Sequence, residues 1–352
     1  MSMKFQKGSG DFFALDIGTN AVRVLQLAPA GDAWELVAHG YAPVDRRITS
    51  SDAPESRRRL GEVIMTAVGQ SGIKTKNVAI GLPSNKTFTT VVDVPQVSDA
   101  ELRATMKYQI DQYVPMSDDA KVDWVLLGPS LHASDQQEVL ISSVSKGYSE
   151  DQLEFIEGLG LNVIAIEPDP IAMVRAFAPL QQAANGAAVM LIDIGELSTD
   201  LAIIYGGAPR LVRTIPSGVS SFVKSAVQNL SVQEDQARQF ILKFGLAEDK
   251  LDGQVVRAIE GALDNFASEL IKSIKFFQTR YASAQVSSIT LTGFGEMIPH
   301  LSEYVAAKVE VSTAPGNPWH GIHMPQTSQE QLANVAPEFA TAVGLAKRRN
   351  DA

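Results

Sequence analysis

The hydrophobic positions of this 352-residue chain fall into short apolar runs that end in polar turns, and one pattern occurs twice. Four apolar residues precede the tripeptide Asp-Ile-Gly at Asp16 and again at Asp193, about half the chain length apart. A second apolar run follows each copy, over residues 21–27 and 201–205. These paired runs predict two β-hairpins, each with its acidic residue and its glycine at the turn.

Further apolar runs follow in a similar order in the two halves of the chain. Strands are predicted over 34–41, 78–83, 163–167, 210–215 and 288–292, and helices over 54–70, 219–230, 232–244 and 255–281. The long helix at 255–281 carries one apolar stripe at spacings of three and four, which is typical of a core-facing helix. The repeated order predicts an α/β protein with a duplicated fold, whose halves cover residues 1–182 and 183–352.

Residues 86–160 interrupt the repeated order and predict a small α/β module inserted in the first half. Its strands are expected over 87–94, 122–127 and 138–143, and its helices over 98–113 and 149–159. Ser98 and Glu101 form a capping box at the start of the first of these helices. A final helix over about 337–349 is expected to pack back on the first half.

The two Asp-Ile-Gly turns have the chemistry of a duplicated loop for phosphate and metal. Gly18 and Gly195 let backbone N–H groups approach phosphate oxygens, and hydroxyl groups just downstream add donors. Mg²⁺ takes one or two carboxylates and keeps its waters, so Asp16 and Asp193 are candidate ligands. A single Asp-Ile-Gly is also a common end of a strand, and a purely structural turn is the alternative for one copy. Two matching copies favour nucleotide binding between two related halves.

Composition argues against several other classes of protein. The chain is 45% hydrophobic, and 30 Lys and Arg against 40 Asp and Glu give a formal net charge of −10. An acidic chain without a basic aromatic patch is not expected to bind nucleic acid. Cysteine is absent, which excludes disulfides and agrees with a cytoplasmic location. No apolar run reaches the roughly 20 residues of a membrane span, and residues 1–11 have no signal-peptide core.

A third glycine turn and one further segment complete the pattern. The strand at 288–292 runs into Gly293-Phe294-Gly295 and then into a helix, which turns backbone N–H groups toward a ligand. With the segment 166–172 and the two Asp-Ile-Gly loops, this turn resembles the actin-like ATPase superfamily, whose ribonuclease H-like fold is duplicated. By this resemblance the four segments are the first phosphate loop, the first connecting helix, the second phosphate loop and the adenosine loop.

The resemblance to the superfamily implies roles for individual residues. Asp16 and Asp193 would hold Mg²⁺ through water, and Glu167 would orient a water molecule near the γ-phosphate. The implied contacts to ATP or ADP are Asp16, Gly18, Thr19, Asn20, Asp193, Gly195, Ser198, Thr199 and Gly218 around the phosphates, with Glu269, Lys272, Ser273, Gly293, Phe294 and Gly295 around the nucleoside.

Within the superfamily the chain most resembles the PilM family of type IV pilus assembly. The resemblance is carried by the stretches 108–115 with Asp123 downstream, 160–168, 269–277 and 339–346. The module at 86–160 then corresponds to a subdomain shared with the cell-division protein FtsA. Phe294 and Val219 stand at positions where glycine is common in related loops.

The PilM resemblance implies a cytoplasmic scaffold or switch that is peripheral to the inner membrane. A groove on the first half would receive the N-terminal cytoplasmic tail of a PilN-like membrane protein, and components of the pilus motor ATPase are further expected partners. ATP hydrolysis, at most weak, is left open. Two alternatives remain. A small-molecule kinase would need an extra carboxylate base, which no motif nominates, and an FtsA-like division protein should end in an amphipathic membrane helix rather than in the basic residues 347–349.

Overall fold

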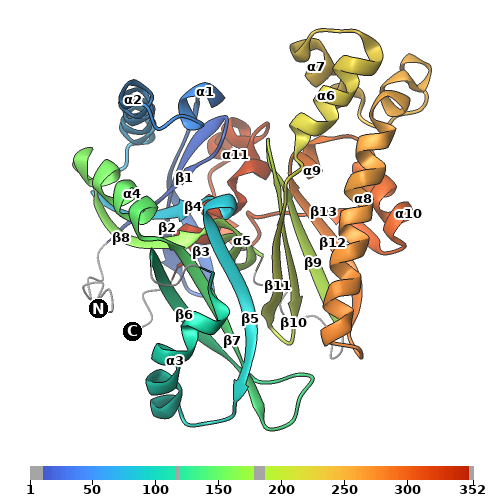
Figure 1. Cartoon of the computed structure of the whole chain (residues 1–352). Helices are drawn as coiled ribbons and strands as arrows, with labels where there is room; N and C mark the ends of the chain where they lie inside the picture. Colours follow the sequence, from blue (N-terminus) through green and yellow to red (C-terminus); the bar gives the residue numbers. More distant parts are fainter. Residues whose placement is uncertain (1–10, 116–118, 178–186, 349–352) are drawn as a thin grey trace.

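Three β-sheets organise the chain, which this computed structural model describes at residues 11–115, 119–177 and 187–348 (Figure 1). The first sheet has the order β14-β3-β2-β1-β4-β8. Its strands are β1 (Phe13–Ile17), β2 (Ala21–Ala30), β3 (Ala33–Pro43), β4 (Asn77–Leu82), β8 (Asn162–Pro168) and β14 (Ile322–His323). The second sheet has the order β11-β10-β9-β12-β13. Its strands are β9 (Ala187–Ile194), β10 (Thr199–Tyr205), β11 (Ala208–Ile215), β12 (Gln285–Gly293) and β13 (Ser312–Pro315).

The first two sheets have the same construction, which confirms the predicted duplication. In each, a central strand pairs antiparallel with the next strand along the chain, as β1 does with β2 and β9 with β10. Each central strand also pairs in parallel on its other side, β1 with β4 and β9 with β12. The turns of the two hairpins match as well, because Gly18 N donates to Ala21 O at 3.0 Å and Gly195 N donates to Ser198 O at 2.9 Å.

Helices cover the sheets and connect their strands. Those of the first half and the inserted module are α1 (Arg46–Thr49), α2 (Pro54–Ser71), the 3-10 turn η1 (Ser84–Lys86), α3 (Asp99–Tyr113), α4 (Lys146–Gly158) and α5 (Asp169–Ala176). Those of the second half and the end of the chain are α6 (Val219–Leu230), α7 (Glu234–Phe244), η4 (Leu251–Gly253), α8 (Gln254–Arg280), α9 (Phe294–Met297), α10 (Leu301–Val309), α11 (Gln326–Leu332), η5 (Ala336–Phe339) and α12 (Ala340–Ala346). Among the described residues, no helix is both long enough and apolar enough to cross a bilayer.

The cores follow the predicted apolar faces. The stripe of α8 is buried at Leu263, Phe266, Leu270 and Phe277, where it packs with α6 against the second sheet. The expected final helix is instead the 3-10 turn η5 followed by α12, and residue 349 lies outside the described part. The expected division at residue 182 lies outside it too. α12 packs against α5, and an added Cβ at Gly344 would lie 1.7 Å from Ala172 O, so the two backbones are in direct contact.

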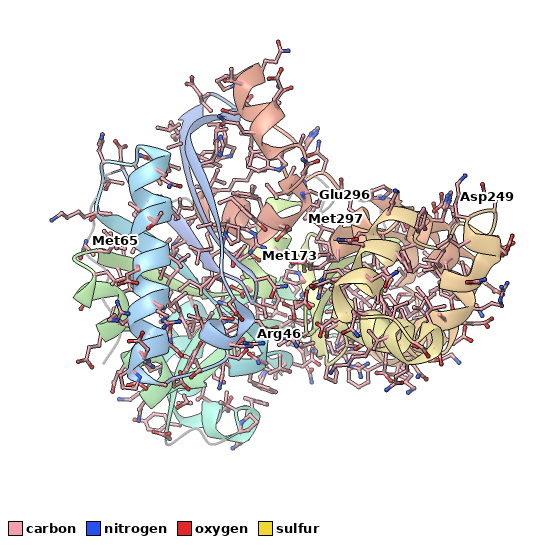
Figure 2. The ribbon with its side chains drawn as sticks, turned by 90° about the horizontal axis from the view of Figure 1, so that it is seen from above. Arg46, Met65, Met173, Asp249, Glu296 and Met297 are labelled. Carbon is pink, nitrogen blue, oxygen red and sulfur yellow. The ribbon has the colours of Figure 1, made fainter. Side chains whose placement is uncertain are left out.

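The inserted module is a three-stranded sheet with the order β5-β7-β6, covered by α3. Its strands are β5 (Thr87–Pro95), β6 (Ala120–Pro129) and β7 (Gln136–Ser145). The capping box predicted at Ser98 and Glu101 is present at the start of α3. In Figure 1, β5 runs beside β11 of the second sheet, so the module borders both halves. The view from above in Figure 2 shows Arg46 of the first half at the border with the second half.

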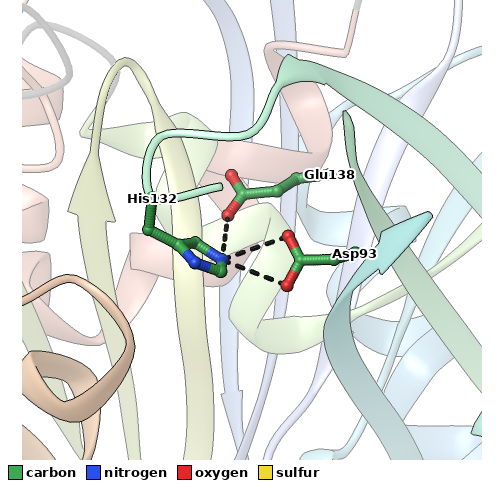
Figure 3. A group of neighbouring side chains, drawn as sticks. All are labelled: Asp93, His132 and Glu138. Carbon is green, nitrogen blue, oxygen red and sulfur yellow. Dashed lines mark hydrogen bonds and ion pairs between the residues drawn. The ribbon is translucent and has the colours of Figure 1, made fainter. Parts of the chain in front are cut away.

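A buried cluster of charges fastens the module to the second half. Glu138 on β7 is 0% exposed, and it accepts hydrogen bonds from Arg210 on β11 and, at 2.5 Å, from the hydroxyl of Tyr281. Arg280 at the end of α8 bonds Asp93 on β5 at 2.8 Å. Asp93, His132 and Glu138 are close enough to share a metal ion (Figure 3). Because their carboxylates already accept from Arg and Tyr side chains, we interpret the group as an ion-pair cluster.

Candidate functional site

The two Asp-Ile-Gly hairpins face each other across a cavity of about 180 Å³ between the two halves. The third predicted loop, at Gly293 and Phe294, lies at the same cavity because β12 runs alongside β9. The structure therefore brings most of the predicted phosphate contacts together. Predicted residues that line the cavity are Asp16, Gly18, Thr19, Asn20, Asp193, Gly195, Ser198, Gly293 and Phe294.

Four aspartates from both halves converge on this cavity. In the second hairpin, Asp193 pairs directly across the strands with Asp200. Asp16 comes from the first hairpin, and Asp169 comes from the first turn of α5. Among the described residues, Asp169 Oδ1 is one of the few buried side-chain nitrogen or oxygen atoms without a hydrogen-bond partner. Hence the cavity concentrates negative charge and leaves one buried oxygen available to a ligand.

The pKa values of these carboxyl groups show that the protein disfavours their full ionisation. Burial raises the pKa of Asp193 to about 7, and Asp200 beside it acts in the same direction. The pKa of Asp169 is well above its usual range because of burial and of the charges on Asp16 and Asp200. Burial also raises the pKa of Asp16, although the Arg23 guanidinium beside it acts in the opposite direction. A bound cation would relieve this repulsion.

Arg23 alone is basic among the described residues that line the cavity. It stands opposite Asp16 in the first hairpin, and its Nη1 donates to Asp16 Oδ2 at 3.1 Å. Arg23 Nη2 donates a hydrogen bond to the carboxylate of Glu338 in η5, which also accepts from the Tyr41 hydroxyl at 3.3 Å. An added Cβ at Gly18 would lie 2.6 Å from Arg23 Nη1. Gly18 therefore makes room for this guanidinium at the turn.

Polar contacts cross the cavity and join the two halves. Asn20 of the first hairpin donates to Glu196 of the second at 2.7 Å. Arg238 of α7 forms a two-pronged pair with the same carboxylate, at 3.0 and 2.5 Å. Farther out, Arg46 of α1 and Glu234 of α7 approach to 3.6 Å. The contacts of Asn20 with Glu196 and of Arg46 with Glu234 hold the halves close together on the α7 side, and Arg238 anchors Glu196 within the second half.

Three of the predicted residues lie behind the cavity wall. Thr199 is fully buried and donates to Ser217 O at 2.7 Å, so its hydroxyl is already used. An added Cβ at Gly218 would lie 2.5 Å from Gly195 O, and at Gly295 it would contact the side chain of Ile194. These two glycines allow the loops to pack on each other instead of lining the cavity.

The other predicted residues lie elsewhere. Glu167 pairs with Arg175 at 2.5 Å and lies in a separate groove, so the structure does not bring it to the phosphate loops. Glu269, Lys272 and Ser273 do share one face of α8, as their spacing predicts. However, Glu269 pairs with Arg213 at 2.6 Å, and Arg213 Nη1 donates to the Ser273 hydroxyl at 2.9 Å. They are not among the residues that line the cavity.

Asp169, Asp200, Arg23, Glu196 and Glu338 are cavity residues to which sequence reasoning assigned no role. Asp200 ends the second loop, and hairpin pairing alone places it opposite Asp193. Asp169 follows Glu167 by two positions, in the turn where β8 gives way to α5. Sequence contains no local signal for Glu338, because it reaches Arg23 from the far end of the chain.

A groove of about 680 Å³ separates the inserted module from the first half. On the module side it is lined by Trp124 and Val125 of β6 and by Leu140 of β7. The opposite wall comes from β8, α5 and the end of α12, and it contributes Ile166, Glu167, Pro168, Ile171, Arg175, Lys347 and Arg348. Because β6 is an edge of the three-stranded sheet, the groove combines an open strand edge with apolar side chains on both walls and charged side chains on the wall opposite the module.

The family model for type IV pilus assembly protein PilM matches residues 14–350 of this chain. The chain belongs to the PilM family. It is accordingly a PilM-like type IV pilus assembly protein, which favours this interpretation over the kinase and FtsA-like alternatives. A solved PilM-PilN type IV pilus biogenesis complex is similar over 96% of this chain and 98% of that one, with 20% identity and a TM-score of 0.82.

More distant structures share the architecture of this PilM-family chain. Ethanolamine utilization protein EutJ from Carboxydothermus hydrogenoformans is similar over 96% of this chain and 90% of that one, with 13% identity and a TM-score of 0.54. MreB 5 of Spiroplasma citri bound to AMPPNP is similar over 93% and 99%, with 12% identity and a TM-score of 0.51. At such identities the likeness shows the fold alone, which is actin-like.

Proposed function

We propose that this PilM-family protein is a nucleotide-dependent scaffold of the pilus assembly platform. It binds ATP or ADP with Mg²⁺ between its halves, residues 1–182 and 183–352, and it binds the N-terminal tail of a PilN-like membrane protein in the groove beside the inserted module. Through this partner it is held in the cytoplasm at the inner membrane. The observation that carries the proposal is the convergence of four aspartates and two matching glycine turns on one cavity.

The residues of the cavity fit a hydrated Mg²⁺ and phosphates. Mg²⁺ accepts carboxylate and water oxygens, and the acidic cluster of Asp16, Asp169, Asp193 and Asp200 supplies the carboxylates, including the unpartnered Asp169 Oδ1. When bound, the metal neutralises the charge that would otherwise repel phosphates. Thr19 and Ser198 border the same cavity and can donate hydroxyl groups to phosphate oxygens.

Nucleotide binding is tested by thermal denaturation with Mg·ATP, with Mg·ADP and with Mg²⁺ alone. A ligand that binds only the folded protein raises its stability by mass action, so both nucleotides should raise the melting temperature beyond the effect of Mg²⁺. Asp193→Asn should remove most of the nucleotide effect, because a neutral amide is a poor Mg²⁺ ligand. If millimolar nucleotide leaves the melting temperature unchanged, the cavity is not a nucleotide site.

The groove has the features of a site for a short extended peptide. Its strand edge can pair with a peptide backbone, and its apolar walls can receive alternate side chains. On the opposite wall, Glu167 pairs with Arg175 at 2.5 Å and with Arg348 at 3.3 Å. These side chains offer a bound peptide both negative and positive charges. Family membership and the fold shared with the PilM-PilN complex support a PilN-like tail as the occupant.

Peptide binding is best tested by a point substitution. Deleting residues 86–160 would leave Arg210 of the second half without Glu138, so loss of binding could reflect misfolding. Val125 in the groove and Val37 on β3 are both 52% exposed. Val125→Asp should abolish binding of a peptide from the N-terminus of the cognate PilN-like protein in a fluorescence anisotropy titration, and Val37→Asp should not. If Val125→Asp binds the peptide as tightly as Val37→Asp does, the groove is not the peptide-binding site.

A further inference from the structure

Glu196 has an unusual position for an acidic residue, because it lies in the second phosphate loop itself. Its side chain is 3% exposed and lines the same cavity as Gly18 and Ser198. Three donor groups from two other elements hold its carboxylate, namely Asn20 Nδ2 at 2.7 Å and two nitrogens of Arg238 at 3.0 and 2.5 Å. Both halves of the chain thus converge on one buried anion.

The geometry around Glu196 is the geometry that recognises a phosphate. Arg binds carboxylate and phosphate in the same two-pronged manner, because both present two oxygens in one plane to the guanidinium fork. Asn20 approaches from the first hairpin and Arg238 from α7, and their donors meet at the Glu196 carboxylate, which lines the cavity together with Asn20. A terminal phosphate placed between these loops would compete with Glu196 for these donors.

We propose that Glu196 is an internal competitor of the terminal phosphate, and that Arg238 and Asn20 bind this phosphate when Glu196 is displaced. The proposal rests on the proposed nucleotide site. The size of the cavity agrees with it, since about 180 Å³ is less than the roughly 300 Å³ of typical ligand sites. A nucleotide therefore has to break the contact between Asn20 and Glu196 that crosses the cavity. A nucleotide with a γ-phosphate can then accept hydrogen bonds from Asn20 and Arg238 in place of Glu196.

The competition predicts a specific change in nucleotide selectivity. Glu196→Gln removes the competing charge, so affinity for a non-hydrolysable Mg·ATP analogue should rise about tenfold, the order of one charge-assisted hydrogen bond. Affinity for Mg·ADP should change little. Arg238→Gln should weaken the ATP analogue selectively, and the gain from Glu196→Gln should disappear in the double variant. Calorimetric titration of each variant measures these affinities.

Two controls keep the outcome interpretable. Glu234→Gln removes a negative charge at the outer contact with Arg46 without releasing Arg238, so it should leave selectivity unchanged. Arg238→Gln alone leaves the buried Glu196 without its ion pair, although Asn20 still donates to it, and the double variant avoids that destabilisation. If Glu196→Gln binds the ATP analogue no more tightly than the parent protein, or gains equally without Arg238, the proposal is wrong. If no variant binds any nucleotide, the proposed function itself fails.

Discussion

The ion pair between Arg210 and Glu138 should be the strongest single link between the inserted module and the second half. The two side chains are 2% and 0% exposed. Arg210→Met keeps most of the volume but removes the positive charge, so the buried Glu138 loses its nearest ion-pair partner. Removing one partner of a buried pair costs about 3–5 kcal/mol of folding free energy. Tyr281 still donates to Glu138 at 2.5 Å and Arg280 lies 3.6 Å away, so we expect the lower end, about 3 kcal/mol.

Urea denaturation, followed by two probes to verify a single transition, measures this loss. The double variant Arg210→Met with Glu138→Gln should recover most of the stability, because the amide carries no charge and can still accept from Tyr281. Arg58→Met removes an exposed guanidinium that pairs with Glu55, and it should have no measurable effect. A loss below about 1 kcal/mol for Arg210→Met would show that the pair behaves like a solvated surface pair and would refute the reasoning.

Four further tests probe the cavity and its supports. Because the pKa of Asp193 is raised to about 7, Mg²⁺ affinity in calorimetry should fall up to about tenfold per pH unit below that value, since the metal must displace a proton. Without metal, the folded state binds the extra proton, so thermal stability should fall as pH rises toward 7, and Asp193→Asn should flatten this slope. Gly81→Ala places a Cβ 2.1 Å from Asp169 Oδ1 and should weaken Mg·nucleotide binding while circular dichroism stays unchanged. Gly344→Ala, 1.7 Å from Ala172 O, should lower the melting temperature by several degrees, and an unchanged value would mean that α12 can shift.

Local patterns in the sequence predicted the elements that depend on neighbours along the chain. The two hairpins and the stripe of α8 were predictable because alternation and three-to-four spacing are local signals. Glu167 illustrates the limit. Strand alternation ends at Pro168, and the side chain directions of Glu167 and Asp169 depend on how β8 turns into α5. Asp169 enters the cavity, whereas Glu167 meets Arg175 in the groove.

Long-range contacts account for the rest of what sequence could not predict. Helical spacing correctly placed Glu269 and Ser273 on one face of α8, but it could not reveal that Arg213 of β11 occupies that face. Similarly, Arg23 is an ordinary strand residue until the hairpin register sets it opposite Asp16. Glu338 joins them only because the end of the chain returns between the halves.

One strand of the inserted module contacts both the second half and the proposed peptide groove. Glu138, Leu140 and Ser142 alternate along β7 and therefore share one face of its sheet. Glu138 is tied to Arg210 of the second half, whereas Leu140 and Ser142 line the groove against the first half. If a nucleotide changes the angle between the halves, Arg210 carries the module with it, and the groove changes width. A nucleotide in the cavity can thus alter the affinity of the groove for a PilN-like tail that it never touches. This coupling requires that the nucleotide and the tail each bind one angle between the halves more tightly than the other.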